Sequence, residues 1–88
     1  MSWTALTVVW SKGAVKDVRG LVAKELSQIE SAVSTFAATG TGDIKKLQGD
    51  DGYRIAVRGR RVMCKIAFSN HTLTVMQVIL RGEAYGKK

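Results

Sequence analysis

The sequence predicts an α+β fold in the order β-α-α-β-β-β, a small antiparallel sheet with a helix pair packed on one face. Three observations support this prediction. β-Branched and aromatic residues near the start indicate a strand, and apolar residues with helical spacing follow it. In the second half, apolar and polar residues alternate, as in half-buried strands. With 88 residues, 45% of them hydrophobic, the chain 1–88 is expected to form a single domain.

The first half of the chain is expected to form one strand and two helices. Residues 4–10 (TALTVVW) predict a strand, and the hydroxyl of Ser11 can cap the helix that follows. Across residues 14–36, apolar side chains recur every three or four positions, which is typical of a helix with one buried face. Gly20 lies inside this pattern and costs about 1 kcal/mol relative to Ala, so we expect a break into two helices there. Gly40 is suited to end the second helix in the left-handed conformation.

The second half is expected to form a loop followed by three strands. Residues 43–52 predict a loop held by Ile44 and Leu47. The period then changes to two, which predicts strands over 53–58, 61–68 and 73–80, joined by turns at Gly59 and at 69–71. Adjacent strands joined by short turns form an antiparallel meander.

The single cysteine, Cys64, excludes an internal disulfide and a cysteine-based zinc site. Alternation places it on the packed face, so we expect a small buried hydrophobe and not a nucleophile. No cofactor is expected. No apolar run approaches the roughly 20 residues that span a bilayer, and the start lacks the features of a signal peptide. We therefore expect a soluble, cytoplasmic protein with no membrane partner.

Positive charge is concentrated in the second half. Fourteen Lys and Arg against seven Asp and Glu give a net charge of +7. Up to Gly42 there are four basic and three acidic residues (+1), and after it ten basic and four acidic residues (+6). From Arg54 to Arg81 there are six basic residues and no carboxylate. Such a field favours a polyanionic partner, although a basic protein kept soluble by its charge would have the same composition.

Alternation assigns four of these cations to one face of the sheet. Arg54, Arg58, Arg61 and Lys65 are expected on the open face, away from the helices. Like charges opposite one another destabilise a sheet, so we expect a phosphodiester or an acidic protein to bind there and relieve the repulsion. The alternative is an ordinary solvated face.

The last residues of the sequence add further candidates for binding nucleic acid. Arg81 presents planar donors that fit phosphate, and Tyr85 offers a ring for base stacking and a hydroxyl. Lys87 and Lys88 follow them. A tyrosine near a terminus is more often a packing residue, so the functional interpretation depends on its neighbour Arg81.

Four short motifs occur in a defined order over nearly the whole chain. They are Lys46-Leu47-x-Gly49, Gly52-Tyr53-Arg54-Ile55, Arg60-Arg61-Val62 and Arg81-Gly82-Glu83-Ala84-Tyr85. In this order and spacing, the sequence resembles the RelE/ParE toxin superfamily of bacterial toxin–antitoxin modules. The RelE-like branch is favoured.

The resemblance implies a toxin of a type II toxin–antitoxin system. RelE-like members are ribosome-dependent endoribonucleases that cut mRNA and inhibit translation, and a cognate antitoxin wraps and neutralises them. ParE-like members keep the fold and poison DNA gyrase. A third interpretation, from another class, is a basic nucleic-acid-binding domain without toxicity. We favour the endoribonuclease.

The resemblance also implies a site. Four residues are expected to be catalytic without a metal, namely Arg54, Arg61, Arg81 and Tyr85. Arg61 and Arg81 would stabilise the charge of the phosphorane, and Tyr85 would stack on a base or take part in proton transfer. The other cations after Gly42 are expected to bind RNA, namely Lys45, Lys46, Arg58, Arg60, Lys65, Lys87 and Lys88.

The sequence departs from the family pattern at two positions. Ala56 occupies a position that is lysine in some active members, and Leu80 stands where several members have histidine. The lone histidine, His71, lies at the other end of the last strand. No aspartate or glutamate is expected to take over these acid/base roles.

Overall fold

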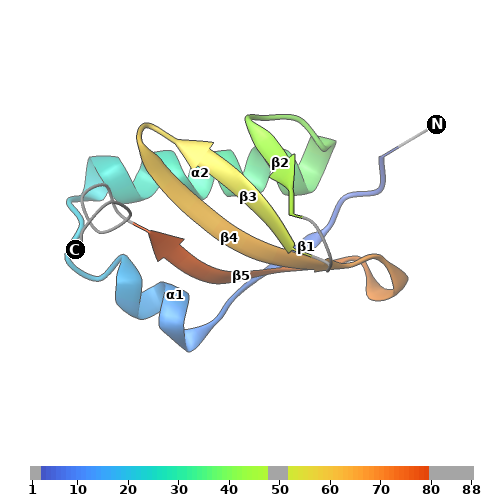
Figure 1. Cartoon of the computed structure of the whole chain (residues 1–88), viewed down its shortest axis with the longest axis horizontal. Coiled ribbons are helices and arrows are strands. Elements are labelled where there is room, and N and C mark those ends of the chain that lie inside the picture. Colours follow the sequence, from blue (N-terminus) through green and yellow to red (C-terminus); the bar gives the residue numbers. More distant parts are fainter. Residues whose placement is uncertain (1–2, 48–51, 80–88) are drawn as a thin grey trace.

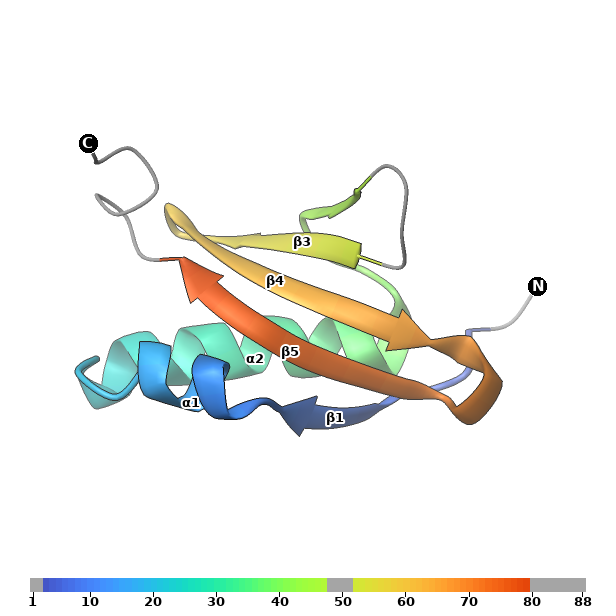
Figure 2. The ribbon, with the colours of Figure 1, turned by 60° about the horizontal axis from the view of Figure 1, so that its bottom comes forward.

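The computed structural model describes residues 3–47 and 52–79, which form two helices packed on a five-stranded sheet (Figure 1). The elements in chain order are β1 (Thr7–Trp10), α1 (Lys12–Asp17), α2 (Ala23–Thr39), β2 (Ile44–Lys46), β3 (Gly52–Val57), β4 (Arg60–Ala67), the 3₁₀ turn η1 (Phe68–Asn70) and β5 (Thr72–Ile79). The strand order is β1-β5-β4-β3-β2. Both helices lie together on one side of the sheet (Figure 2). The predicted α+β class, with a helix pair on one face, is confirmed.

The predicted helix signals are also confirmed. The Oγ of Ser11 accepts the backbone N–H of Ala14 at 3.1 Å and caps α1. The break at Gly20 separates α1 from α2. Gly40 adopts φ +77° and donates its N–H to the carbonyl of Phe36 at 2.8 Å, which ends α2. Neither helix of the described chain is long and apolar enough to cross a membrane.

The antiparallel meander of β3, β4 and β5 is present as expected. Arg58 and Gly59 join β3 to β4 with φ values of +50° and +85°, and two positive φ values are typical of the type I′ turn. Between β4 and β5 the register shifts, so that Met76 has no partner in β4. This bulge lets Val75 and Val78 on either side of it both face the core.

The first strand is shorter than predicted and pairs differently. β1 begins at Thr7 and not at Thr4, because the preceding chain is bound to the end of α2. The N–H of Leu6 and the Nε1–H of Trp3 both donate to the carbonyl of Ala37, each at 2.9 Å. β1 then pairs in parallel with β5 at the edge of the sheet, so the sheet is not wholly antiparallel.

The prediction of a loop over residues 43–52 is wrong for its first part. Ile44–Lys46 form β2, which pairs with β3 in antiparallel orientation. Three residues are too few to show a periodic pattern, and the strand forms because β3 supplies the hydrogen-bonding partner. At the other end, Leu80, the predicted last residue of the final strand, lies outside the described residues.

The core lies between the two helices and the sheet, and two polar contacts anchor the helices to the sheet. α2 contributes Ile29, Val33 and Phe36, and the sheet contributes Ile55, Val62, Leu73, Val75 and Val78. At the end of α1, Asp17 accepts the backbone N–H of Val78 at 2.8 Å. Val78 lies in β5 beyond Val75, the last residue of that strand that pairs with β1. In α2, Glu25 binds Arg60 at 2.8 Å and joins the helix to the start of β4.

Gly40→Ala should destabilise the protein by at least about 1 kcal/mol, because an L residue is strained at this φ. A Cβ there would also lie 2.7 Å from the Cε3 atom of Trp3. Urea denaturation measures the loss. Gly20→Ala is the matched control, since a Cβ at Gly20 meets nothing within 4 Å and its φ is not positive. Equal unfolding midpoints for the two variants would contradict this account.

Candidate functional site

Four cationic side chains lie on the face of the sheet that is not covered by the helices. Lys45 in β2 lies opposite Arg54 in β3, and Arg54 lies opposite Met63 in β4. Arg61 and Lys65 occupy β4 two residues to either side of Met63, so their side chains share its face. We call Lys45, Arg54, Arg61 and Lys65 the basic face.

Arg54 lies at the centre of the basic face. Residues directly opposite on antiparallel strands have Cβ atoms about 5 Å apart, and diagonal neighbours are about 7–8 Å apart. Lys45 is the direct neighbour of Arg54, and Arg61 and Lys65 are its diagonal neighbours. All three distances are within reach of long cationic side chains. An anion of the size of a phosphate can therefore contact several of these groups at once.

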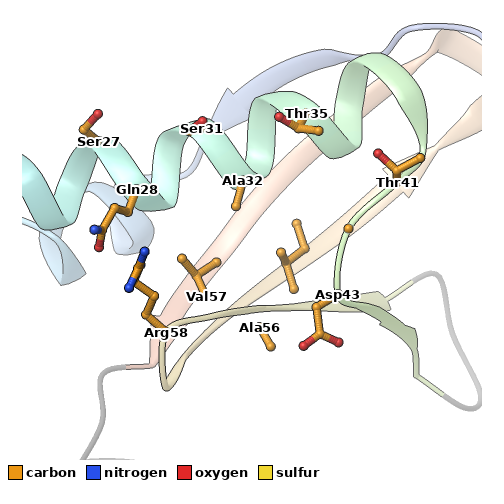
Figure 3. A pocket seen from close by; sticks show the side chains of 12 residues that line it. Ser27, Gln28, Ser31, Ala32, Thr35, Thr41, Asp43, Ala56, Val57 and Arg58 are labelled. Carbon is orange, nitrogen blue, oxygen red and sulfur yellow. The ribbon is translucent and has the colours of Figure 1, made fainter.

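Three other predicted RNA-binding cations face the helix side. Arg60 bonds to Glu25, and its side chain is 18% exposed. Lys46 lies opposite Tyr53, on the other side of the sheet from Lys45. Arg58 was expected on the open face, and that expectation is wrong: its side chain points towards Gln28 of α2 (Figure 3). Arg58 belongs to the turn with φ +50°, so the alternation of β3 does not continue to it.

Asp43 is a candidate that the sequence analysis missed. Its carbonyl accepts the N–H of Ala56 at 3.0 Å, and Ala56 lies opposite Arg61. The side chains of Asp43 and Ala56 both point away from α2, which places a carboxylate at the border of the basic face (Figure 3). No local pattern could have identified it, because three residues are too few to show strand character. The pairing of β2 with β3 is what places positions 43 and 45 on one face.

The remaining predicted site residues lie outside the described residues. These are Arg81, Tyr85, Lys87 and Lys88, together with Leu80 and Gly49 of the family pattern. Their roles stay predictions. Within residues 3–47 and 52–79, no group of three or more His, Cys, Asp or Glu side chains could hold a metal ion.

A pocket of about 470 Å³ lies on the helix side, between α2 and the outer edge of β3 (Figure 3). Its helix wall carries Ser27, Ser31 and Thr35, one turn apart. The end of β3 and the turn residue Arg58 form the opposite wall. β3 lies between the pocket and the basic face, and Asp43, at the border of that face, also lines the pocket.

Cys64 is buried, as expected, and is unsuited to nucleophilic chemistry. Its side chain faces the core, with 2% of the residue exposed, and its Sγ donates to the carbonyl of Tyr53 at 3.6 Å. Burial raises the pKa of the Cys64 thiol from 9.0 to about 11, because desolvation disfavours the thiolate.

The fold matches solved structures of RelE toxins. The chain aligns with the toxin–antitoxin complex RelBE2 from Mycobacterium tuberculosis at TM-score 0.78 and 16% identity, covering 91% of this chain and 95% of that one. For the archaeal RelE–RelB complex from Pyrococcus horikoshii OT3 the TM-score is 0.77 at 20% identity, with coverages of 90% and 98%. This chain has the RelE fold.

The chain also matches the structure of a RelE toxin without its antitoxin. A mutant of E. coli RelE in the free state aligns at TM-score 0.74 and 22% identity, covering 92% of this chain and 87% of that one. No protein-family model matches the sequence, and no curated protein matches it by sequence. The chain thus has the RelE fold with few residues shared with these toxins, so its chemistry depends on its own side chains.

Thiol labelling tests the position of Cys64 in this RelE fold. At pH 8, a thiol with a pKa of about 11 is roughly 0.1% thiolate, against about 10% at the ordinary value of 9.0. Ellman's reagent should therefore react at least about a hundredfold more slowly with the folded protein than with the urea-unfolded protein. The rate should rise as the pH approaches 11. Equal rates at pH 8 would show that Cys64 is an accessible thiol.

Proposed function

We propose that this chain is the toxin of a type II toxin–antitoxin system and that it cleaves mRNA on the ribosome. The observation that carries the proposal is the basic face, with four cations gathered on the open side of a RelE-fold sheet and the Asp43 carboxylate at its border. A strand of RNA is a polyanion that lies along such a face and relieves the repulsion among its cations.

Cleavage of RNA at a phosphodiester requires three events. The 2′-hydroxyl loses a proton and attacks phosphorus, the phosphorane gains negative charge, and the 5′-oxygen leaves with a proton. Arg61 is suited to the second event because its guanidinium is permanently charged. Arg54 cannot act as the base for the same reason, and we assign it to phosphate binding together with Lys45 and Lys65.

Asp43 is our candidate for the base that accepts the 2′ proton. Asp43 and Arg61 flank Ala56 on neighbouring strands, so their backbones are about 10 Å apart. A ribose and its phosphate fit between a carboxylate and a guanidinium at this separation. Tyr85, whose role comes from the family resemblance, would then supply the proton to the 5′-oxygen. The ribosome contributes by holding the mRNA in the reactive orientation.

The partner that restrains such a toxin is expected to be a cognate antitoxin. Several of the similar structures, including those from Mycobacterium tuberculosis and Pyrococcus horikoshii OT3, are complexes of a toxin with its antitoxin. In this chain the net charge of +7 and the basic face favour an antitoxin with an acidic segment. Covering Arg54 and Arg61 with that segment would block access of RNA.

Expression of the protein should arrest growth and produce new mRNA 5′ ends, and Arg61→Ala should abolish both. Loss of charge stabilisation of this kind costs about a hundredfold or more in cleavage rate. Arg60→Ala is the control from the adjacent position, because Arg60 faces α2 and bonds to Glu25. It should lose at most about 1 kcal/mol of stability and keep cleavage.

Three outcomes would contradict all or part of the proposal. Growth arrest with DNA breaks and no new mRNA ends would identify a gyrase poison. Absence of arrest would identify a basic domain without toxicity. Unchanged cleavage by Arg61→Ala would reject the assigned mechanism even for an active nuclease.

Asp43→Asn should separate binding from chemistry. The amide cannot accept the proton, so single-turnover cleavage on programmed ribosomes should slow by about a hundredfold or more. Binding of RNA should stay equal or tighten, because a negative charge beside the phosphates has been removed. Weaker binding with an unchanged cleavage rate would show that Asp43 does not act as the base.

A further inference from the structure

We propose that Gln77 in β5 selects the base of a nucleotide beside the cleaved bond, and that the base it selects is adenine. This inference rests on the proposed function and deepens it, because the cations of the basic face bind the backbone of any RNA sequence alike. Three side chains carry it, namely Arg54 in β3, Met63 in β4 and Gln77 in β5, and we call them the reading row.

The reading row crosses three neighbouring strands at one level of the sheet. Arg54 lies directly opposite Met63, and Met63 lies directly opposite Gln77, on strands that run side by side (Figure 2). Paired residues point to the same side, so all three side chains lie on the face that the helices leave open. Neighbouring strands are about 4.8 Å apart, which makes the row about 10 Å wide. This width is comparable to the distance from the phosphate of a nucleotide to the far edge of its purine base.

The chemistry of the reading row changes in the order that one nucleotide requires. At the β3 end, Arg54 and its direct neighbour Lys45 attract the phosphate. In the middle, Met63 is half-buried and offers an unbranched thioether against which a base can pack. At the other end there is no charge, because β5 (Thr72–Ile79) contains no Lys, Arg, Asp or Glu. A nucleotide with its phosphate at Arg54 therefore places its base over Met63 and the edge of that base at Gln77.

The reading row lies next to the groups assigned to cleavage. Arg61 is two residues from Met63 in β4, or about 7 Å along the strand, which is comparable to one nucleotide of an extended RNA. The Asp43 carboxylate lies beside Ala56 at the β2 end, with β3 and β4 between it and β5. It is therefore too far from Gln77 to compete for the same base. The row thus addresses a nucleotide that flanks the cleaved bond.

Gln77 has the hydrogen-bonding groups that identify adenine. Its side chain is exposed, and its carboxamide forms no hydrogen bond within residues 3–47 and 52–79. The carboxamide presents one donor and one acceptor side by side, and the N7 and N6 groups of adenine present the complementary pair. Guanine has two acceptors, N7 and O6, at that edge, so the carboxamide oxygen would face O6 without a proton between them. Pyrimidines lack N7 and extend less far from the phosphate.

Binding of RNA that cannot be cleaved tests the selection of the base apart from the chemistry. The probes are fluorescently labelled pentaribonucleotides with 2′-O-methyl groups and the sequences UUAUU and UUGUU. A third probe carries 7-deazaadenine, in which a C–H group replaces N7. The full chain should bind the adenine probe at least about fivefold more tightly than either other probe, as measured by fluorescence anisotropy. Gln77→Ala should bind all three probes equally.

Single-turnover cleavage on programmed ribosomes should show the same selectivity. Adenine at one of the two nucleotides that flank the cleaved bond should give cleavage at least about fivefold faster than guanine there. Gln77→Ala should remove this ratio. Gln77→Arg should reverse it, because Arg presents two donors to the N7 and O6 acceptors of guanine. A residue with only a structural role would not exchange one base preference for another.

Two further variants locate the selection at Gln77. Thr74 lies on the same face of β5, opposite Lys65, one row along the sheet. Thr74→Val replaces a hydroxyl by a methyl group of similar size and should keep the preference for adenine. Met63→Ala should weaken binding of all three probes by the same factor, because packing against a thioether does not distinguish the edges of the bases.

Three results would overturn the proposal. They are equal binding of the adenine and 7-deazaadenine probes by the unaltered chain, an unchanged adenine preference in Gln77→Ala, and loss of that preference in Thr74→Val. Its failure is distinguishable from failure of the nuclease. Adenine-selective binding without any cleavage would reject the nuclease and keep the reading row, whereas cleavage without base selectivity would keep the nuclease and reject the reading row.

Discussion

The packing of α2 against one face of the sheet determines what the other face can do. Ile29, Val33 and Phe36 bury the apolar residues of β3 and β4, and alternation then directs the residues between them to the open face. A slip of one residue in β3 would move Arg54 into the core and Ile55 into solvent. Burying an unpaired guanidinium costs several kcal/mol, so the register is strongly specified. The register that buries the core residues therefore also places the cations of the basic face on the open side of the sheet.

The fold tolerates a cluster of like charges because the opposing energies differ in size. Two unit charges 4 Å apart in water repel by about 1 kcal/mol, and flexible side chains such as Lys45 and Lys65 can move farther apart. Each fully buried Val, Leu or Ile contributes about 1.5–3 kcal/mol, and the sheet buries five such residues beneath the two helices. Core packing therefore wins over charge repulsion. The repulsion remains available to favour a bound polyanion, which is the physical link between this sheet and its proposed substrate.

Local signals in the sequence were sufficient for the α+β class, the break at Gly20, the caps at Ser11 and Gly40, the meander and the burial of Cys64. Each of these features depends on periodicity or on the conformational preference of one residue. Both kinds of signal are local and do not depend on distant parts of the chain. Periodicity can be met by many sequences, which explains a RelE fold at 16–22% identity to solved relatives. The central place of Arg54 on the open face follows from the same alternation.

Only the tertiary structure decided which groups gather around that centre. β2 exists because β3 pairs with it, and this pairing brings Lys45 beside Arg54 and Asp43 to the border of the basic face. Arg58 turns to the helix side because its positive φ interrupts the alternation, and Arg60 is held by Glu25, 35 residues earlier. The sequence alone determined the pattern within each element. The partners of each element were determined by contacts between residues far apart in the chain, which no local pattern records.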